Sequence, residues 1–482
     1  MFVREQGPDT LAEIKMTQTA IETSSISLRS VNNSGPTTTS SFAGKPDEER
    51  PYDEERSRSR ERDRSNHDGA PTVAELTFPE GGLKAWLVVF GSFCAMLSVF
   101  GLINSAAVFE SYFSQNQLAD HSPSEIGWIF SLYLFIVFFV GIQVGPLFDN
   151  YGPRGLVTAG GLCISASLLL LSLCKEYYQI LLAYSILGGL GGALLNSPSY
   201  GAIAHFFDLR RGFATGIAAT AGSIGGIVYP ILLQNLFPTL GFGPTARILG
   251  FILLGLTIPA TLFIRSRLPK KEGPSSIWPD FTVFRNLKFT LSAVGIFFME
   301  WGLFVPITYI ISYAGRAQHG DVQVHSYTIL SILNAGSAVG RFLPGLAADI
   351  YGRFNVILIT IALCFITIFG LWLPSGHSQP MLLAFVALFG FASGSNLGLV
   401  PVCLGQLCDA REYGRFFSTA MMMASFGTLS SLPIAGAILE SGKDGQNWDG
   451  LIIFSGASYV LAFICYASVR VLAVGWKPTA KF

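Results

Sequence analysis

Charged residues are scarce in this 482-residue sequence, at 13% of the chain, whereas hydrophobic residues make up 50%. A water-soluble protein of this size could not hide so much apolar surface in one core, because too few polar residues would remain to cover it. The composition therefore excludes an ordinary soluble protein. It indicates that lipid is the solvent for most of the chain.

The sequence also lacks the patterns on which enzymes and metal sites depend. Its seven cysteines are scattered, mostly inside apolar stretches, and none has the Cys-x-x-Cys or Cys/His spacing of a metal site. No nucleophile with a neighbouring base and no phosphate-binding glycine loop stands in a suitable context. We therefore expect no metal, no cofactor and no enzymatic activity.

Long hydrophobic runs are missing from residues 1–79, which hold a large share of the charge and are rich in Ser, Thr and Pro. Such a segment cannot offset the entropy of ordering, so we predict a disordered tail. Acidic residues interrupt the basic stretch at 54–65, which disfavours nucleic-acid binding and favours a solvated regulatory tail. No apolar signal-peptide segment opens the chain, so we expect the first membrane helix to direct insertion.

The remaining sequence is a series of apolar runs. About 20 residues span the roughly 30 Å hydrocarbon layer as a helix, and backbone groups in lipid must be satisfied internally. Twelve runs of this length predict transmembrane helices near 85–107, 126–148, 155–174, 178–200, 212–235, 246–265, 290–313, 326–348, 355–373, 380–403, 415–438 and 450–472.

The distribution of Lys and Arg in the short loops predicts the orientation of these helices. An even number of helices places both termini on one side of the membrane. That side carries Arg154, Arg210, Arg211, Arg265, Arg267, Lys270, Lys271, Arg285, Lys288, Arg353, Arg411 and Arg415, and the other carries Lys175, Arg247, Arg316 and Lys443. Both termini are therefore predicted to be cytosolic.

An internal repeat relates the two halves of the chain. The segment Gly145-Pro-Leu-Phe-Asp149-Asn-Tyr151-Gly152 recurs 200 residues later as Gly345-Leu-Ala-Ala-Asp349-Ile-Tyr351-Gly352. The starts of the fifth and eleventh helices also match, with Asp208-Leu-Arg-Arg211-Gly212 and Asp409-Ala-Arg411-Glu-Tyr-Gly414. The repeat predicts an all-α membrane protein of two pseudo-symmetric six-helix bundles.

The predicted organisation has five parts. They are a disordered cytosolic tail (1–79), an N-terminal bundle (80–265), a cytosolic central loop (266–289), a C-terminal bundle (290–473) and a cytosolic C-terminal tail (474–482).

The repeated loop has the composition of a conformational switch. An Asp at a helix end, a tight Tyr-Gly turn and a following cation can hold neighbouring helices in one state and release them in another. We therefore assign conformational gating to Gly145, Asp149, Gly152 and Arg154 and to their counterparts Gly345, Asp349, Gly352 and Arg353. The alternative is an ordinary polar hairpin.

Glycine pairs at GxxxG spacing, Gly188 with Gly192 and Gly212 with Gly216, allow close approach of helices four and five to their neighbours. Static packing and a rocking interface both explain such faces, and the sequence leaves both open.

At these residues the chain resembles the major facilitator superfamily, whose loop pattern G-x-L-x-D-x-x-G-x-[RK] is met by the first copy of the repeat. It is most similar to the fungal branch of the monocarboxylate porter family. That likeness rests on Pro79-Glu80-Gly81-Gly82 followed by Trp86, and on Arg211-Gly212-Phe-Ala-Thr-Gly216. The resemblance covers residues 79–475 and implies a secondary transporter.

Ionisable and polar residues inside the spans are the candidate transport residues, because they are costly in lipid. Arg341 in helix eight could bind a substrate carboxylate, and Glu300 in helix seven could exchange protons. Asn104, Asn334 and Asn396 are further candidates for substrate binding. A structural ion pair or interhelical hydrogen bonds are the alternatives.

The resemblance also limits the substrate assignment. Proton-linked monocarboxylate carriers have a Lys in helix one and an Asp before the helix-eight Arg, and these positions fall on Asn104 and Ser337. Only the Arg is retained, so lactate-type symport is not supported by the site residues.

Three functions follow as hypotheses. The first is a carrier, facilitative or proton-coupled, for a small organic anion or other metabolite, acting as a monomer in a lipid bilayer. The second is an efflux carrier for a larger secondary metabolite, and the third a non-transporting sensor that signals through its N-terminal tail. We expect no nucleic-acid partner and a plasma-membrane location, with the vacuolar membrane as the alternative.

Overall fold

The computed structural model describes residues 77–482 except 269–277, 318–325, 377, 443–445 and 478–479, and these residues belong to one compact unit. The predicted N-terminal tail lies outside the described residues apart from 77–79. Part of the predicted central loop, including Lys270 and Lys271, also lies outside them.

The N-terminal half consists of helices of very unequal length. They are α3 (Leu83–Asn104), α4 (Ala106–Gln115), α5 (Pro123–Phe139), α6 (Gly141–Tyr151), α7 (Pro153–Leu171), α8 (Tyr177–Ile180), the π-helix η1 (Leu181–Gly188), α9 (Gly189–Ala204), α10 (Arg211–Leu240) and α11 (Phe242–Phe263).

The C-terminal half follows the same plan. It contains the 3-10 turn η2 (Phe281–Arg285), α12 (Leu287–Ala317), α13 (Ser326–Tyr351), α14 (Arg353–Thr367), the π-helix η3 (Ile368–Trp372), α15 (Gln379–Gln406), the 3-10 turn η4 (Ala410–Glu412), α16 (Tyr413–Glu440) and α17 (Trp448–Val474).

Twelve helical segments in the described part of the chain are long and apolar enough to cross a membrane, which confirms the predicted number. Most predicted boundaries lie inside the observed ones, because a helix continues past its apolar stretch into polar residues. Thus α10 ends at Leu240 rather than near 235. The first span differs in the other direction, since its helix breaks at Ser105 and α4 continues separately.

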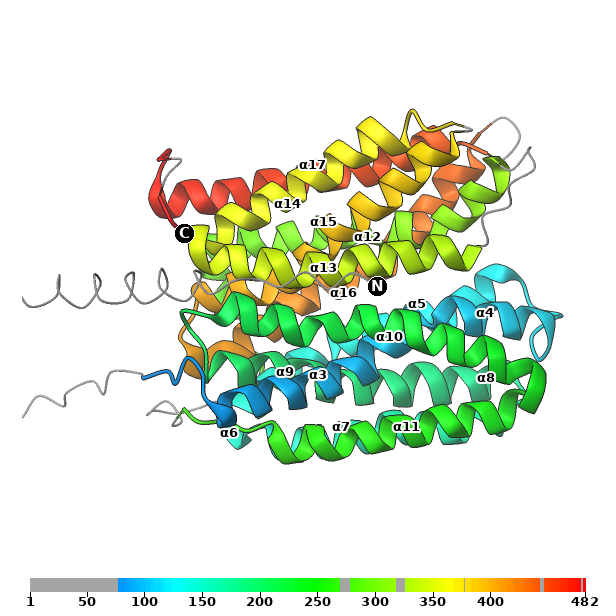
Figure 1. The fold of residues 1–482 in the computed structure, drawn as a ribbon, viewed down its shortest axis with the longest axis horizontal. Coiled ribbons are helices and arrows are strands. Elements are labelled where there is room, and N and C mark those ends of the chain that lie inside the picture. The colour runs from blue at the N-terminus through cyan, green and yellow to red at the C-terminus, as the bar shows by residue number, and fades with distance from the viewer. Residues whose placement is uncertain (1–76, 269–277, 318–325, 377, 443–445, 478–479) are drawn as a thin grey trace, which may run out of the picture. The chain divides into compact units, whose positions relative to one another are not determined.

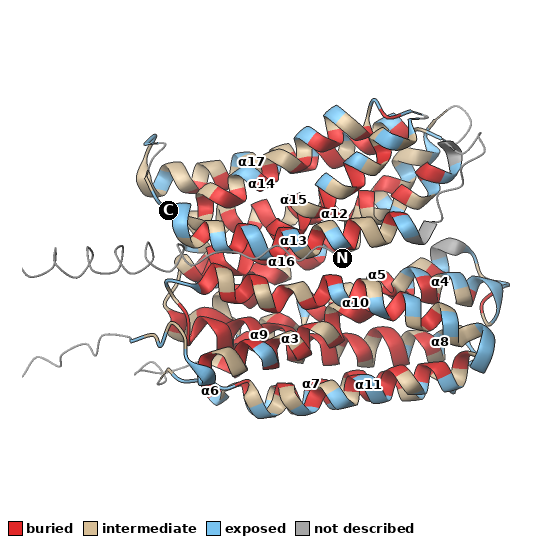
Figure 2. Cartoon of the chain, in the orientation of Figure 1, coloured by how far each residue is buried: buried red, intermediate tan, exposed pale blue. Residues whose placement is uncertain are grey.

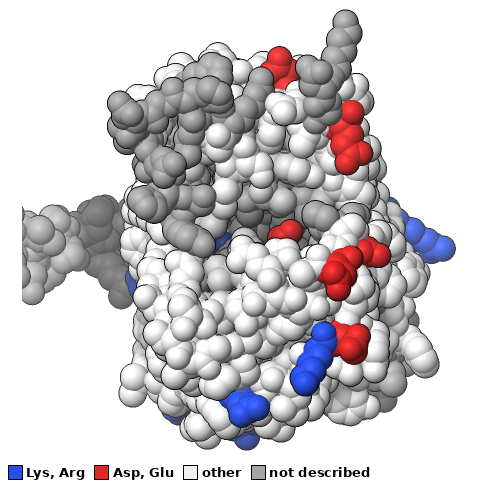
Figure 3. All heavy atoms as spheres, turned by 90° about the vertical axis from the view of Figure 1, so that its right-hand side faces the viewer, with Lys and Arg blue, Asp and Glu red and all other residues white. Residues whose placement is uncertain are grey.

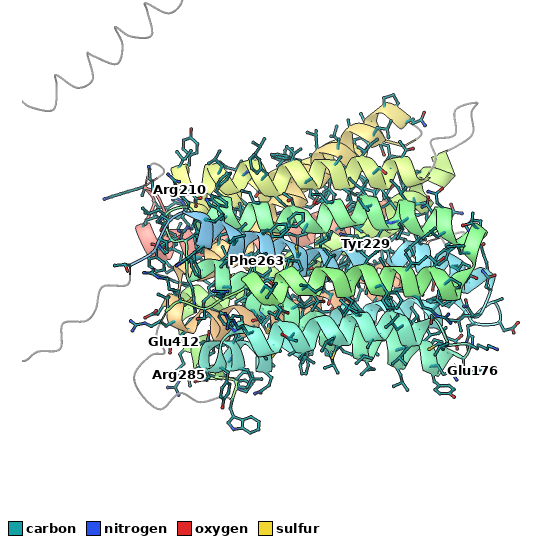
Figure 4. The ribbon with its side chains drawn as sticks, turned by 60° about the horizontal axis from the view of Figure 1, so that its bottom comes forward. Glu176, Arg210, Tyr229, Phe263, Arg285 and Glu412 are labelled. Atoms are coloured by element: carbon teal, nitrogen blue, oxygen red, sulfur yellow. The ribbon has the colours of Figure 1, made fainter. Side chains whose placement is uncertain are left out.

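The helices form two bundles that meet along α10 and α13 (Figure 1), whose residues lie in extensive contact. We call the end of the bundles where α3 begins and α17 ends the basic end, because most loop Arg and Lys residues lie there. Figure 4 shows Arg210, Arg285 and Glu412 at this end and Glu176 at the opposite end.

Two glycines make the tight turns of the repeated loop. Gly152 (φ 81°) separates α6 from α7, and Gly352 (φ 102°) separates α13 from α14. A residue with a Cβ rarely adopts such angles, so only glycine reverses the chain here within one residue. The shared turn explains why Tyr-Gly recurs in both copies.

Burial follows the expectation for a protein in lipid. Buried residues lie between the helices of each bundle, and exposed or half-buried ones lie on the outer faces (Figure 2). Those outer faces carry large apolar side chains, for example Ile258 (61% exposed) and Ile359 (67% exposed). Apolar side chains this exposed indicate a lipid-facing surface.

The glycine pairs separate into two kinds of contact. A Cβ built on Gly188 would meet Tyr133 and Ser167 of the same half, so this pair packs one bundle internally. A Cβ on Gly212 or Gly216 would lie 2.4 Å from carbonyl oxygens of α13, so these glycines face the other half. Only the second kind lies at the interface between the two halves.

Candidate functional site

Arg341 lies where the two halves meet and is 6% exposed. Its Nη1 donates a hydrogen bond of 2.6 Å to the Ala219 carbonyl of α10 in the opposite half. Its Nε has no hydrogen-bond partner among the described residues. Arg341 also interacts electrostatically with Tyr200 of α9, whose ring packs against Phe417 of α16. The guanidinium is therefore surrounded by both halves and keeps one donor unpaired.

Two of the three predicted asparagines flank the same stretch of α10. Asn104 Nδ2 donates to the Gly222 carbonyl at 2.9 Å, and Asn334 Nδ2 donates to the Gly226 carbonyl at 3.3 Å. A Cβ on Gly222 would lie 2.5 Å from Arg341 Nη1. The structure thus brings Asn104, Asn334 and Arg341 together along α10, at the boundary between the two halves, which we call the seam. The glycines of α10 leave room there for these side chains.

Asn396 lies elsewhere. Its Oδ1 accepts a hydrogen bond of 2.7 Å from Thr360 Oγ1, and its Nδ2 contacts Cys364 Sγ at 3.3 Å. Both partners belong to α14, so this amide binds α15 to a helix of its own half. Ser337, at the position of the expected Asp, lies 3.1 Å from Ser223 Oγ across the seam.

Glu300 is buried within the C-terminal half and is 5% exposed. It interacts electrostatically with Tyr459 and Tyr466 of α17 and lies against Gly427 of α16. The Tyr466 hydroxyl has no hydrogen-bond partner among the described residues, whereas the Tyr459 hydroxyl interacts with the Cys364 thiol of α14. No ion pair between Glu300 and Arg341 is present in the described part of the chain, so the structure does not bring these two together.

The repeated aspartates bind the opposite half at the basic end. Asp149 accepts hydrogen bonds from the Gly414 and Arg415 amides (2.9 and 2.8 Å) at the start of α16. Asp349 accepts bonds of 2.8 Å from the Gly212 and Phe213 amides at the start of α10. A carboxylate at a helix N-terminus satisfies free amides and complements the helix dipole.

The repeated glycines let these helices approach. A Cβ on Gly145 would lie 2.2 Å from the Gly414 carbonyl oxygen, and one on Gly345 would lie 2.5 Å from the Gly212 carbonyl oxygen. Backbone therefore contacts backbone at both crossings, α6 with α16 and α13 with α10. Ser197 and Ser418 add a hydrogen bond of 2.8 Å between the halves.

The two predicted gating cations differ. Arg353 donates to the Asp208 carbonyl and lies 3.6 Å from its carboxylate, and Arg211 lies 3.2 Å from the same carboxylate. Arg154 is exposed and takes part in no ion pair with the described residues. The cation of the second copy thus forms an ion pair with the opposite half, and the cation of the first copy forms none among the described residues.

His205 is a functional candidate that the sequence did not reveal. Its Nε2 lies 3.1 Å from the Ala410 carbonyl of the other half, and its Nδ1 lies 2.8 Å from Ser266 Oγ. Burial lowers the pKa of His205 to about 4, so the ring is neutral at pH 7. A neutral ring bonds Ala410 by donating its Nε2 proton and accepts the Ser266 hydroxyl at Nδ1.

A cavity of about 590 Å³ lies at the basic end next to these contacts, and Arg211, Asp349, Arg353 and Cys408 line it. Burial raises the pKa of the Cys408 thiol to about 12, which keeps it in the unreactive thiol form. At the opposite end, Figure 3 shows a hollow between the halves with acidic side chains in and around it. The halves are therefore joined at one end and parted at the other.

Comparison with known proteins shows consistent similarities. The Major Facilitator Superfamily model matches residues 88–376 and 291–481. The MFS-type transporter opdF of Penicillium oxalicum is 37% identical over 412 residues, covering 86% of this chain and 96% of that protein. The riboflavin transporter MCH5 of Saccharomyces cerevisiae is 37% identical over 424 residues (83% and 81% covered). The fujikurins efflux protein of Gibberella fujikuroi is 34% identical over 409 residues (84% and 85%).

Solved structures share the fold. The human organic anion transporter MFSD10 (TETRAN) superimposes with a TM-score of 0.64 at 13% identity, covering 80% of this chain and 100% of that one. The transporter FucP in its outward conformation gives a TM-score of 0.62 at 15% identity, with 80% and 99% covered. At these identities the likeness concerns the fold alone.

Proposed function

Since the chain belongs to the Major Facilitator Superfamily and is a membrane transporter, we propose that it carries a small organic anion or related metabolite by alternating access. The observation that carries the proposal is Arg341, a buried guanidinium between the halves with an unpaired Nε. We also propose that the chain belongs to the fungal branch of the monocarboxylate porter family.

The guanidinium has the geometry to bind an anion. Nη1 is occupied by the Ala219 carbonyl, whereas Nε lies on another edge of the planar group. An arginine edge presents two parallel N–H donors that match a carboxylate. A substrate there would lie beside Asn104 and Asn334, whose amides can hydrogen-bond its polar groups. Asn396 is not part of this proposed site, because α14 holds its amide.

The contacts at the basic end explain how access would alternate. In this state Asp149 and Asp349 close that end, whereas a hollow lies between the halves at the opposite end. Opening the basic end requires both aspartates to leave their helix starts while α10 slides past α13 on its glycines. We propose that the basic end is cytosolic, following the excess of Arg and Lys there, and that the carrier is a monomer in the plasma membrane.

Glu300 is our candidate for proton coupling. A carboxyl group buried between helices is stable only when neutral or paired, so its protonation state would couple to the packing of α12 against α17. Tyr459 and Tyr466 offer it hydroxyl partners within the same bundle.

Efflux of a larger metabolite is the second candidate, and the opposite end of the molecule favours it. Glu110 of α4 and Glu440 of α16 both interact electrostatically with Tyr309 of α12. Carboxylates of the two halves therefore lie close together at the end opposite the basic end. Negative charge there opposes entry of an anion and favours its release. Relatives named as a riboflavin transporter and a fujikurins efflux protein agree with bulky substrates.

Reconstituted transport distinguishes these functions. Purified protein in proteoliposomes is offered carboxylates, riboflavin and neutral metabolites in both directions, with and without a pH gradient. Arg341→Ala should weaken transport of an anionic substrate about 30-fold or more, because loss of a buried charged contact costs about 2 kcal/mol or more. Arg247→Ala, an exposed arginine at the opposite end, is the control. Equal transport by both variants for every substrate would exclude the anion site.

The sensor hypothesis has its own test, removal of residues 1–75. A carrier should keep its flux in proteoliposomes after this truncation. A sensor that signals through its tail would show no flux before or after the truncation and would lose its signal.

A further inference from the structure

The segment that leads into α3 is bound to the loop before α10. Glu80 Oε1 accepts hydrogen bonds from the Asp208 and Leu209 amides (2.7 and 2.8 Å), and Oε2 accepts one from the Arg210 amide (3.0 Å). The Glu80 amide in turn donates to the Phe206 carbonyl at 3.2 Å. One residue thus holds the whole loop through four hydrogen bonds.

The backbone of Glu80 is strained to make these bonds. It is the one non-glycine residue with positive φ (52°) among the described residues, and the left-handed Gly82 follows it before α3 begins. Strain of this kind persists only where the surroundings enforce it. Trp86 adds to the attachment, with its ring 5.4 Å from Phe207 and 5.9 Å from Phe213.

The loop that Glu80 holds is one side of the closure between the halves. Asp208 contacts Arg353, and two amides in the first turn of α10, those of Gly212 and Phe213, bind Asp349. Because Glu80 satisfies the free amides of this loop, the Asp208 carboxylate is not needed as a cap for its own helix. It pairs with the Arg211 side chain of its own helix at 3.2 Å and with Arg353 of the other half at 3.6 Å.

The C-terminal half supplies an internal comparison. Asp409, the counterpart of Asp208, accepts a bond of 2.9 Å from the Arg411 amide of its own turn and pairs with the Arg411 side chain at 3.3 Å. Arg154, the counterpart of Arg353, has no ion pair with the described residues. Among the described residues, Asp409 thus forms an ion pair only within its own turn, whereas Asp208 also pairs with the other half.

The lead-in segment is itself repeated. Phe78-Pro79-Glu80 recurs 200 residues later as Trp278-Pro279-Asp280, directly before η2 and α12. Asp280 accepts hydrogen bonds from the Thr282 amide and hydroxyl, which lower the pKa of its carboxyl group. Its Oδ2 lies 3.6 Å from Arg415 Nη1, at the start of α16 that Asp149 binds.

We propose that Glu80 and Asp280 are positioning residues of the basic-end closure. Each fixes the start of the fifth helix of its own half, and that helix start is what the aspartate of the opposite half binds. Glu80 is the stronger of the two, because it holds three amides whereas Asp280 contributes one partly exposed ion pair. The proposal rests on the alternating-access function above, in which this closure must form and break.

Cys408 reports the closure, since it lines the basic-end cavity, is half-buried and donates its thiol to the Leu404 carbonyl, so its exposure should increase when this end opens. With the other six cysteines replaced by Ala, a membrane-impermeant maleimide is applied from the basic end of full-length protein in proteoliposomes. In the Glu80→Gln variant, the maleimide should label Cys408 at least about tenfold faster than in the parent. In the Asp280→Asn variant, the labelling rate should increase by less. Glu176→Gln, which removes a helix-capping acid at the opposite end, should leave the rate unchanged.

A double-mutant comparison separates positioning from general loss of structure. Glu80→Gln and Asp349→Asn act on the same helix start, so their combination should accelerate labelling by less than the product of the single effects. Unchanged labelling in Glu80→Gln, together with faster labelling in Asp349→Asn, would overturn the proposal and leave the transport function intact. If Asp349→Asn also left labelling unchanged, the alternating-access function itself would fail.

Discussion

Adding one methyl group at Gly345 should open the basic end. The new Cβ would lie 2.5 Å from the Gly212 carbonyl oxygen and 3.1 Å from its carbon, both backbone atoms of the opposite half. Neither atom can move alone, so α13 and α10 must separate by roughly 0.5–1 Å to restore van der Waals contact. That separation also stretches the bonds from Asp349 to the Gly212 and Phe213 amides, which are 2.8 Å in the closed state.

The cost can be estimated from both effects. Overpacking of a tight contact costs about 1–3 kcal/mol. This cost raises the free energy of the closed state and leaves that of the open state unchanged. Since 1.4 kcal/mol is a factor of ten, the open population should rise about 5- to 150-fold. The Cys408 labelling rate should rise with it, because this half-buried thiol becomes more accessible in the open state.

Two further glycines provide the controls for Gly345→Ala. A Cβ on Gly191 would lie 2.6 Å from the Ile164 amide nitrogen of the same half, so Gly191→Ala should lower thermal stability without faster labelling. A Cβ on Gly255 would meet nothing within 4 Å, so Gly255→Ala should change neither. If Gly345→Ala lowered stability like Gly191→Ala and left labelling unchanged, the α10–α13 contact would be static packing and the argument would be refuted.

Three other predictions follow from the site. Asp149→Asn and Asp349→Asn should each weaken the closure by about 1.5–3 kcal/mol, the value of hydrogen bonds to a charged group. Faster Cys408 labelling in both would show that the two copies act alike, and no change in either would remove their gating role. His205 has a folded pKa of about 4 against about 6.5 when unfolded, so its contribution is fully present above pH 6.5 and is lost as the pH falls toward 4. Thermal unfolding should therefore show a loss of about 2 kcal/mol between pH 7.5 and 5 that His205→Asn lacks, and an equal pH dependence in the two proteins would exclude the ring as its source. Glu300→Gln should abolish stimulation of transport by a pH gradient while substrate exchange at equal pH persists; a pH-stimulated variant would dismiss Glu300 as the proton site.

Much of the architecture could be predicted because lipid imposes it. Apolar runs of membrane length must be helices, and the offset between the repeated loops relates the halves. The segment before the first helix of each half is also repeated in the sequence, as Phe78-Pro79-Glu80 and Trp278-Pro279-Asp280. The sequence does not show, however, which groups these acidic residues bind. For Glu80 they are a row of backbone amides, which every sequence contains.

The candidate site was harder to predict for the same reason. Arg341, Asn104 and Asn334 bind backbone carbonyls of α10, and a carbonyl leaves no mark in a sequence. The direction of Asn396 could not be foreseen either, because α15 is apolar on all sides and periodicity does not show which face meets which neighbour. His205 lacked any motif, since it acts through contacts with Ser266 and Ala410, far away in the chain.

The most direct test of alternating access is to lock the basic end. Ser197 Oγ of α9 and Ser418 Oγ of α16 lie 2.8 Å apart across the two halves, so cysteines at these positions can form a disulfide in the closed state. In a protein without its native cysteines, the oxidised Ser197→Cys/Ser418→Cys variant should still bind substrate from the opposite end but transport none. Reduction should restore transport, and each single variant should be insensitive to oxidation. Undiminished transport with the disulfide formed would contradict the account.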